Sequence, residues 1–301
     1  MSSVLGIGVA TLDIVLSVDH YPEEDEKFRA QYRRVNRGGN VTNTLSILSR
    51  LGHQCFWGGT LADDLEANHI KEDLDRHLIN RQFCKKIADG STPTSYILNN
   101  RLTNSRTITH YRDLPEYHFE DFLNHDFNEI NWIHFEGRNC LETANMQAYI
   151  RENHPEITLS VEIEKPRPGI ESLFLNADLL IFSRSYIEST PTPDAESFSF
   201  ILRKKLPGVD FVCPWGDKGA YALSRNGQFT HSRAFTPETV IDTIGAGDTF
   251  IAGIIDATLR GLDLEKATSF ACRIAGEKCG HEGLDFPVDQ AIHDEISGKR
   301  V

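Results

Sequence analysis

The sequence predicts an α/β protein, with a doubly wound, mostly parallel sheet flanked by helices and a second, small β-sheet. Short apolar runs recur along the chain and alternate with amphipathic patterns of helical period. This alternation is typical of buried parallel strands joined by crossover helices. Residues 13–36 and 94–113 instead alternate polar and apolar side chains and show no helical pattern. They predict antiparallel strands with one solvated face, which together form the small sheet.

The large sheet is predicted from its apolar segments. We expect strands at residues 4–10, 132–135, 158–163, 179–182 and 211–213. We expect helices at residues 41–51, 64–78 and 142–151, where apolar side chains recur on one face. Because functional loops gather at the carboxyl ends of parallel strands, the site should lie at that edge of the sheet.

The bulk composition limits the classes of function. The chain has 301 residues, which suits one large domain, so we expect residues 1–301 to form a single α/β domain with the small sheet inserted from about 13–36 and 94–113. The net charge of −13 argues against a nucleic-acid partner. No apolar run is long enough to span a membrane, the N-terminus does not resemble a signal peptide, and six cysteines are scattered without CxxC pairs. We therefore expect a soluble cytoplasmic protein without a membrane partner.

The most informative segment is residues 242–248, which read Asp-Thr-Ile-Gly-Ala-Gly-Asp. We expect a strand at 239–241 before it and a helix at 249–255 after it. At such a turn Gly245, Ala246 and Gly247 leave backbone N–H groups uncovered at the start of a helix, which makes an anion cradle. Asp248 beside this cradle suits proton abstraction from a hydroxyl that attacks a bound phosphate. The alternative is a tight turn followed by an aspartate that the helix dipole favours.

A second polar group surrounds Gly39, before the helix predicted at 41–51. Glycine lets the backbone approach a ligand closely. Asn40 and Asn43 lie one helical turn apart, and carboxamides both donate to and accept from the hydroxyls of a neutral polyol. Asp13 follows the first strand and suits two such hydroxyls. The alternatives are a helix cap at Asn40 and a turn at Asp13.

Two common nucleotide motifs are absent. Gly6 and Gly8 begin a GxGxxG pattern, but its third glycine is replaced by Thr11, so we reject a nicotinamide-cofactor site. No GxxxxGK[ST] segment occurs, which excludes a P-loop phosphotransferase.

Together these segments resemble the ribokinase/PfkB family of carbohydrate kinases. Residues 38–40 are similar to its first signature, and residues 242–248 match its second, D-T-x-G-A-G-D. The resemblance runs nearly end to end. Within the family, the segments at 105–108, 132–139, 160–167 and 270–280 resemble a branch that phosphorylates fructose. The resemblance implies a ribokinase-like fold in which the small sheet forms a lid over the site.

The resemblance also implies roles for individual residues. Asp248 would be the catalytic base, and Gly245, Ala246 and Gly247 would form the anion hole. The sugar would be bound by Asp13, Gly39, Asn40, Asn43 and Arg106, where Arg106 reaches from the lid or is simply a solvated strand residue. Asp242 and Thr243 would hold a monovalent cation such as K⁺, near residues 280–283.

The nucleotide is expected next to a glycine turn and a helix. The expected contacts are Trp215, Gly216, Asp217, Gly219, Ala275 and Cys279. Ala275 and Cys279 lie at i and i+4 and would form an apolar wall for adenine or else a plain packing face. Arg138 and Arg167 would face the triphosphate or pair with Glu136 and Glu164.

The family's Asn-x-x-Glu motif for Mg²⁺ is missing, because residues 183–186 read Ser-Arg-Ser-Tyr. We still expect ATP with Mg²⁺, held mainly by ATP and water with help from Glu162 or Glu164. The leading hypothesis is a kinase that converts fructose to fructose 1-phosphate and dimerises through its lid strands. The alternatives are another PfkB-type kinase, acting on ribose, the fructose 6-hydroxyl or 2-keto-3-deoxygluconate, and a non-catalytic sugar- or nucleotide-binding regulator.

Overall fold

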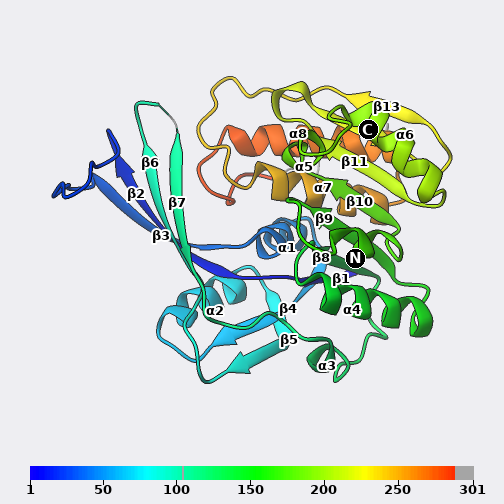
Figure 1. The fold of residues 1–301 in the computed structure, drawn as a ribbon, viewed down its shortest axis with the longest axis horizontal. Helices are drawn as coiled ribbons and strands as arrows, with labels where there is room; N and C mark the ends of the chain where they lie inside the picture. Colours follow the sequence, from blue (N-terminus) through cyan, green and yellow to red (C-terminus); the bar gives the residue numbers. More distant parts are fainter. Residues whose placement is uncertain (104, 289–301) are drawn as a thin grey trace.

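The computed structural model describes residues 1–103 and 105–288 (Figure 1). Its main feature is a nine-stranded sheet with the order β13-β12-β11-β10-β9-β8-β1-β4-β5. Pairing is parallel from β11 to β5 and antiparallel between β11, β12 and β13. The strands are β1 (Ser3–Ile7), β4 (Gln54–Ala62), β5 (Ile79–Ile87), β8 (Trp132–Glu136), β9 (Thr158–Ile163), β10 (Leu179–Phe182), β11 (Asp210–Pro214), β12 (Ala220–Leu223) and β13 (Phe229–Ser232). The predicted mostly parallel sheet is confirmed.

Helices cover both faces of this sheet. Alternate residues of one strand point to opposite faces, so Val4 joins one hydrophobic core and Leu5 joins the other. The first core also contains side chains of α1 (Asn40–Arg50), α2 (Glu66–Arg76), α7 (Ala246–Leu259) and α8 (Leu264–Cys279). The second contains side chains of α3 (Phe119–Phe122), α4 (Cys140–Asn153), α5 (Arg184–Glu188), α6 (Ala195–Lys205) and a 3₁₀ turn at Ile170–Phe174. The architecture is therefore the predicted doubly wound fold.

A separate four-stranded sheet projects away from the large one, to the left in Figure 1. Its order is β3-β2-β6-β7, and its strands are β2 (Thr11–Val18), β3 (Tyr32–Gly38), β6 (Thr94–Asn100) and β7 (Arg106–Tyr111). The small sheet is as predicted, with one difference: β2 and β6 pair in parallel. The long connection between them carries α1, β4, α2 and β5, so β6 can return in the direction of β2. We call these four strands the lid.

Residues 239–241 correct one expectation. The predicted strand before the glycine turn is wrong, because this segment belongs to no strand and the preceding strand is β13. The amide of Ile241 donates instead to the carbonyl of Cys279 at the end of α8, at 2.8 Å. The glycine turn is thus fixed by a helix end and not by a sheet. Among the helices described, none has the length and apolar character needed to cross a bilayer.

Candidate active site

Asp248 lies in the first turn of α7, directly after the glycine turn. Gly245 precedes this helix with φ of 80°, a conformation that favours glycine, and a Cβ there would lie 2.6 Å from Cδ2 of Leu284. Burial raises the pKa of Asp248 to about 7. Glu136 and Glu164 contribute to this rise in the pKa, whereas the Asn43 hydrogen bond and Arg37 oppose it. A carboxylate tuned in this way can accept a proton near neutral pH.

The start of α7 presents backbone donors beside this carboxylate. The first N–H groups of a helix lack partners within the helix and carry the positive end of its dipole. The amide of Ala246 donates weakly to Thr243 O, at 3.2 Å. Gly247 is exposed, and a Cβ built on it would meet no atom within 4 Å, so this side of the turn is open. The turn can therefore receive an anion.

Asn40 and Asn43 both direct their amides to buried carboxylates. Asn43 Nδ2 donates to Asp248 Oδ2 at 2.7 Å, and Asn40 Nδ2 donates to Glu162 Oε1 at 3.0 Å. Gly39 precedes α1 with φ of 111°, and a Cβ there would lie 2.1 Å from Val9 O. Asn40 is the first helical residue and its side chain makes no cap bond. Asn40 therefore does not cap the helix and instead binds Glu162 across the site.

Glu162 on β9 is a second buried acid. Burial raises its pKa well above the usual range, and the nearby Asp248, Glu136 and Glu164 raise it further. Its Oε1 accepts from Asn40, whereas no described group donates to its buried Oε2. An unpaired buried carboxylate oxygen suggests a missing donor or cation.

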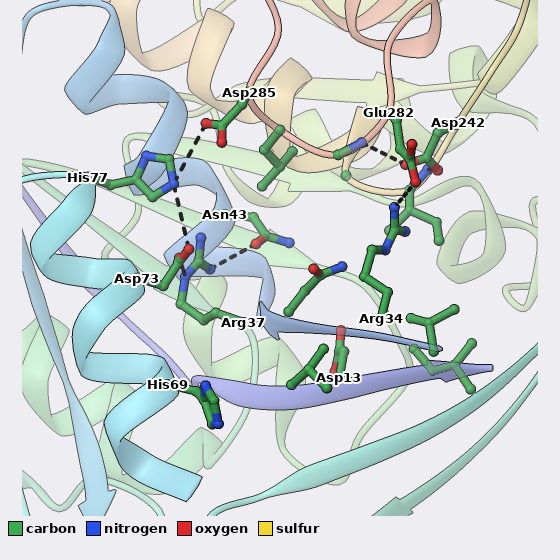
Figure 2. A pocket seen from close by; sticks show the side chains of 18 of the residues that line it. Asp13, Arg34, Arg37, Asn43, His69, Asp73, His77, Asp242, Glu282 and Asp285 are labelled. Atoms are coloured by element: carbon green, nitrogen blue, oxygen red, sulfur yellow. Dashed lines mark hydrogen bonds and ion pairs between the residues drawn. The ribbon is translucent and has the colours of Figure 1, made fainter. Parts of the chain in front are cut away.

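A cavity of about 770 Å³ lies between the lid, helices α1 and α2, and the segments at 242–245 and 282–285 (Figure 2). Asp13 on β2, Asn43 on α1, and Asp242 and Gly245 near α7 line it. Asp13 accepts from the Thr11 hydroxyl at 2.9 Å and leaves its second oxygen toward Gly38, where a Cβ would lie 2.2 Å away. Of the predicted sugar residues, Asp13 and Asn43 line the cavity together with Gly245 of the glycine turn, whereas Gly39 and Asn40 do not line it. Arg106 does not line it, because Arg106 is exposed on β7.

The predicted nucleotide residues lie in the connection between β11 and β12 and on α8. Trp215 is buried at the end of β11 against Tyr221, with a 3₁₀ turn at Gly216–Lys218 that includes Asp217. Gly219 has φ of 91°, and a Cβ there would lie 2.0 Å from Ser232 O. Ala275 and Cys279 are partly buried on α8. The Cys279 carbonyl accepts from the amides of Ile241 and Asp242, so the end of α8 lies beside the glycine turn.

The two candidate arginines differ. Arg138 forms ion pairs with Glu116 and Glu136, at 2.8 and 2.9 Å. It therefore takes the ion-pair alternative with Glu136, while Glu164 pairs with Lys165. Arg167 has a buried Nε to which no described acceptor is paired. Glu116, which lies in an irregular segment, was missed by the sequence analysis.

Lys278 is a feature that the sequence analysis missed. This lysine is fully buried on α8, and its Nζ lies 2.6 Å from Asp242 O and 3.3 Å from Asp242 Oδ2. The amides of Ile244 and Gly283 bond to the two carboxylate oxygens of Asp242. Each oxygen of Asp242, in its carbonyl and in its carboxylate, thus accepts from at least one protein donor. The signal was present, because Lys278 continues the buried stripe of Ala271 and Ile274.

Comparisons with known proteins identify the family of this chain. The model of the pfkB family carbohydrate kinases matches residues 1–291. Ketohexokinase of Mus musculus is 36% identical over 290 residues, which cover 94% of this chain and 97% of that protein.

Two solved structures share the fold. A ribokinase of Arabidopsis thaliana complexed with ribose and ATP superposes with a TM-score of 0.81 at 16% identity, over 98% of this chain and 99% of that chain. A ribokinase of Cryptococcus neoformans in complex with ADP gives 0.77 at 18% identity, over 98% and 100%. From its sequence, its fold and the arrangement at α7, the chain belongs to the pfkB family of carbohydrate kinases.

Proposed function

We propose that the protein transfers the γ-phosphoryl group of ATP to the 1-hydroxyl of fructose. The observation that carries this proposal is Asp248, a buried carboxyl with a raised pKa, beside an open glycine turn and bonded to Asn43 of the sugar-facing helix. The similarity to mouse ketohexokinase supports a ketohexose as substrate. The ribokinase complexes with ATP and ADP support ATP as the donor.

The proposed reaction is an in-line displacement. The sugar lies in the cavity with hydroxyls on Asp13, Asn40 and Asn43 and against the backbone of Gly39. Asp248 removes the proton of the attacking hydroxyl, whose oxygen forms the new bond to phosphorus as the bond to the ADP oxygen breaks. The amides of residues 245–247 stabilise the charge on the migrating phosphoryl group. Arg106 supplies a further positive charge from β7 when the lid closes.

Magnesium enters this proposal with the nucleotide. The described residues include no group of three or more metal-ligating side chains that could hold an ion by itself. The unpaired Oε2 of Glu162 and the neighbouring Glu164 fit the hydrated face of a nucleotide-bound ion. When bound, the ion neutralises charge on the phosphates. A monovalent cation near Asp242 and Thr243 stays a prediction, and we assign it no step because Lys278 already contacts Asp242.

The lid also supports a proposed homodimer. Every residue of the edge strand β7 is exposed, and Tyr96 on β6 is 51% exposed. An uncovered edge strand with apolar side chains favours pairing with another chain. Light scattering at micromolar concentration should give twice the chain mass, and a monomer there would contradict this part of the proposal.

A substrate panel tests the function. Fructose, ribose, adenosine and 2-keto-3-deoxygluconate should be compared in an ADP-coupled assay with Mg-ATP. We expect the highest kcat/KM with fructose, and NMR of the product should show phosphate on the 1-oxygen. Faster turnover of another sugar would reject fructose but keep the kinase. If no member of the panel is turned over while ATP and a sugar still bind in calorimetry, the protein is a binding protein and not a kinase for these substrates.

A further inference from the structure

Arg37 is a buried cation that the proposed mechanism does not use. It lies near the end of β3, and its side chain is 2% exposed. Its guanidinium donates to Asp73 through Nε, to Thr42 and Asn43 through Nη1, and to Ser46 through Nη2. The planar fork of an arginine suits several fixed acceptors at once. Arg37 is thus held between α2 and α1.

The hydrogen bond from Arg37 to Asn43 determines which way the side-chain amide of Asn43 faces. Arg37 Nη1 donates to Asn43 Oδ1 at 2.8 Å, and Asn43 Nδ2 donates to Asp248 Oδ2 at 2.7 Å. The reversed amide would set its NH₂ group against the N–H of Arg37 and its oxygen against the carboxylate of Asp248. Both contacts would then be repulsive, because guanidinium only donates and carboxylate only accepts. The hydrogen bond from Arg37 therefore selects the orientation in which Asn43 donates to Asp248.

Asp73 anchors the other end of this chain of contacts. It pairs with Arg37 and also contacts Arg76 and His77 on its own helical segment. Figure 2 shows Asp73, Arg37 and Asn43 in a row along one wall of the cavity. A continuous series of bonds thus runs from Asp73 on α2 through Arg37 and Asn43 to Asp248 on α7.

We propose that Arg37 is a positioning residue, which holds Asn43 so that its amide keeps the carboxylate of Asp248 in place for proton abstraction. This inference rests on the proposed role of Asp248 as base. It adds a residue that acts on the base through Asn43. The bonds of the series are short, and their members are mostly buried, so a loosened link displaces the next one.

The charges around Asp248 agree with this role. Three carboxylates face it from the large sheet: Glu136 on β8, Glu162 on β9 and Glu164 just after β9. Arg37 faces it from β3 and lowers its pKa, as does the hydrogen bond from Asn43. Loss of orientation at Asn43 therefore favours the protonated, inactive form of the base.

The test is a double-mutant cycle of Arg37→Lys and Asn43→Ala. Lysine keeps the charge but not the fork, so the variant separates orientation from electrostatics. We expect Arg37→Lys to lower kcat by about 10- to 100-fold, as small misplacements of catalytic groups do, with KM for ATP unchanged. The acid limb of kcat/KM should move to higher pH. In the Asn43→Ala background, Arg37→Lys should change neither kcat nor the limb further.

Arg81→Gln is the matched control. Arg81 also pairs with an aspartate of α2, at 2.7 Å from Asp75, but on the exposed surface. The Arg81→Gln variant should have the same kcat and pH profile as the unsubstituted protein. Circular dichroism and a thermal melt establish that each variant is folded, and an unfolded Arg37→Lys protein is replaced by Arg37→Gln in the same cycle.

Two outcomes would overturn the inference. One is an unchanged acid limb and kcat in folded Arg37→Lys, and the other is an equal effect of Arg37→Lys in both backgrounds. Failure of the proposed function looks different, because Asp248→Asn would then retain activity whatever the Arg37 variants do.

Discussion

The two sheets of this protein are built on opposite principles. In the large sheet, β8, β9 and β10 are almost entirely buried between two helical layers. In the lid, β7 is exposed over its whole length, and β2 is only partly buried. The large sheet is held by its own core, whereas the lid still has faces that a ligand or a second chain can cover.

This contrast divides the site into a rigid part and an adaptable part. Asp248, Asn43 and Glu162 sit on helices and a strand of the large layered body, and each makes a side-chain hydrogen bond or ion contact to another element. Arg106 on the lid has no comparable partner among the described contacts. We expect substitutions on the rigid part to act on kcat and substitutions on the lid to act on KM.

The largest effect should come from Asp248→Asn. The variant removes the proton acceptor but keeps the size of the side chain and a hydrogen-bonding group. We expect kcat to fall by about 10²- to 10⁴-fold with little change in sugar binding. Steady-state kinetics and calorimetry with fructose check this, and a variant with normal kcat would show that Asp248 is not the base.

Gly245→Ala should be the next most damaging change. The new Cβ would lie 2.6 Å from Leu284 in a backbone conformation that L-residues avoid, so the turn must move. We expect a loss in kcat of about 10²- to 10³-fold, as for a lost oxyanion donor. Gly261→Ala is the control, because Gly261 has φ of 83° at the other end of α7 with no atom within 4 Å of the new Cβ. Equal losses in the two variants would point to backbone strain alone.

The pH profile tests the rigid part without a mutation. Burial raises the pKa of Asp248 to about 7, and the base acts only when it is ionised. Activity should therefore be full above this pKa and fall about tenfold per pH unit below it. The free energy of unfolding should change with pH in the opposite direction from the activity. The folded state holds this proton more tightly than the unfolded chain does, so the protein loses stability as the pH rises toward 7. An acid limb near pH 4 would show that burial does not raise the pKa in this way.

The smallest effect should appear on the lid, with Arg106→Gln. Because Arg106 is exposed and must approach the site with the lid, we expect KM to rise about tenfold while kcat changes little. Arg33→Gln is the control, since Arg33 is also an exposed arginine and the strand register places it on the other face of the lid. A fall in kcat without a change in KM would place Arg106 in the rigid part.

The sequence predicted the structural features that depend on residues close together in the chain. The apolar runs identified β8, β9, β10 and β11 closely, and the glycine and asparagine segments identified the starts of α7 and α1. The strand expected at 239–241 failed because its β-branched residues have no neighbouring strand to pair with. β4 was not predicted, since its two internal glycines weaken the strand pattern.

Contacts between residues far apart in the chain could not be predicted from the sequence. Arg37 and Lys278 owe their roles to acceptors on Asp73 and Asp242, which lie 36 residues away in each case. Nothing in the local pattern names those partners, because a charged residue is usually solvated and only the fold shows that it is buried. The contact of Asn43 with Asp248 spans 205 residues and is equally hidden.

One contact in Figure 2 gives the lid a mechanical consequence. Arg34 on β3 forms an ion pair with Glu282, which lies next to Gly283, the donor to Asp242. If the lid swings outward to release product in the proposed reaction, it must separate these opposite charges. Dissolved ions weaken such an exposed attraction, so the speed of unloading is coupled to the ionic strength around the protein.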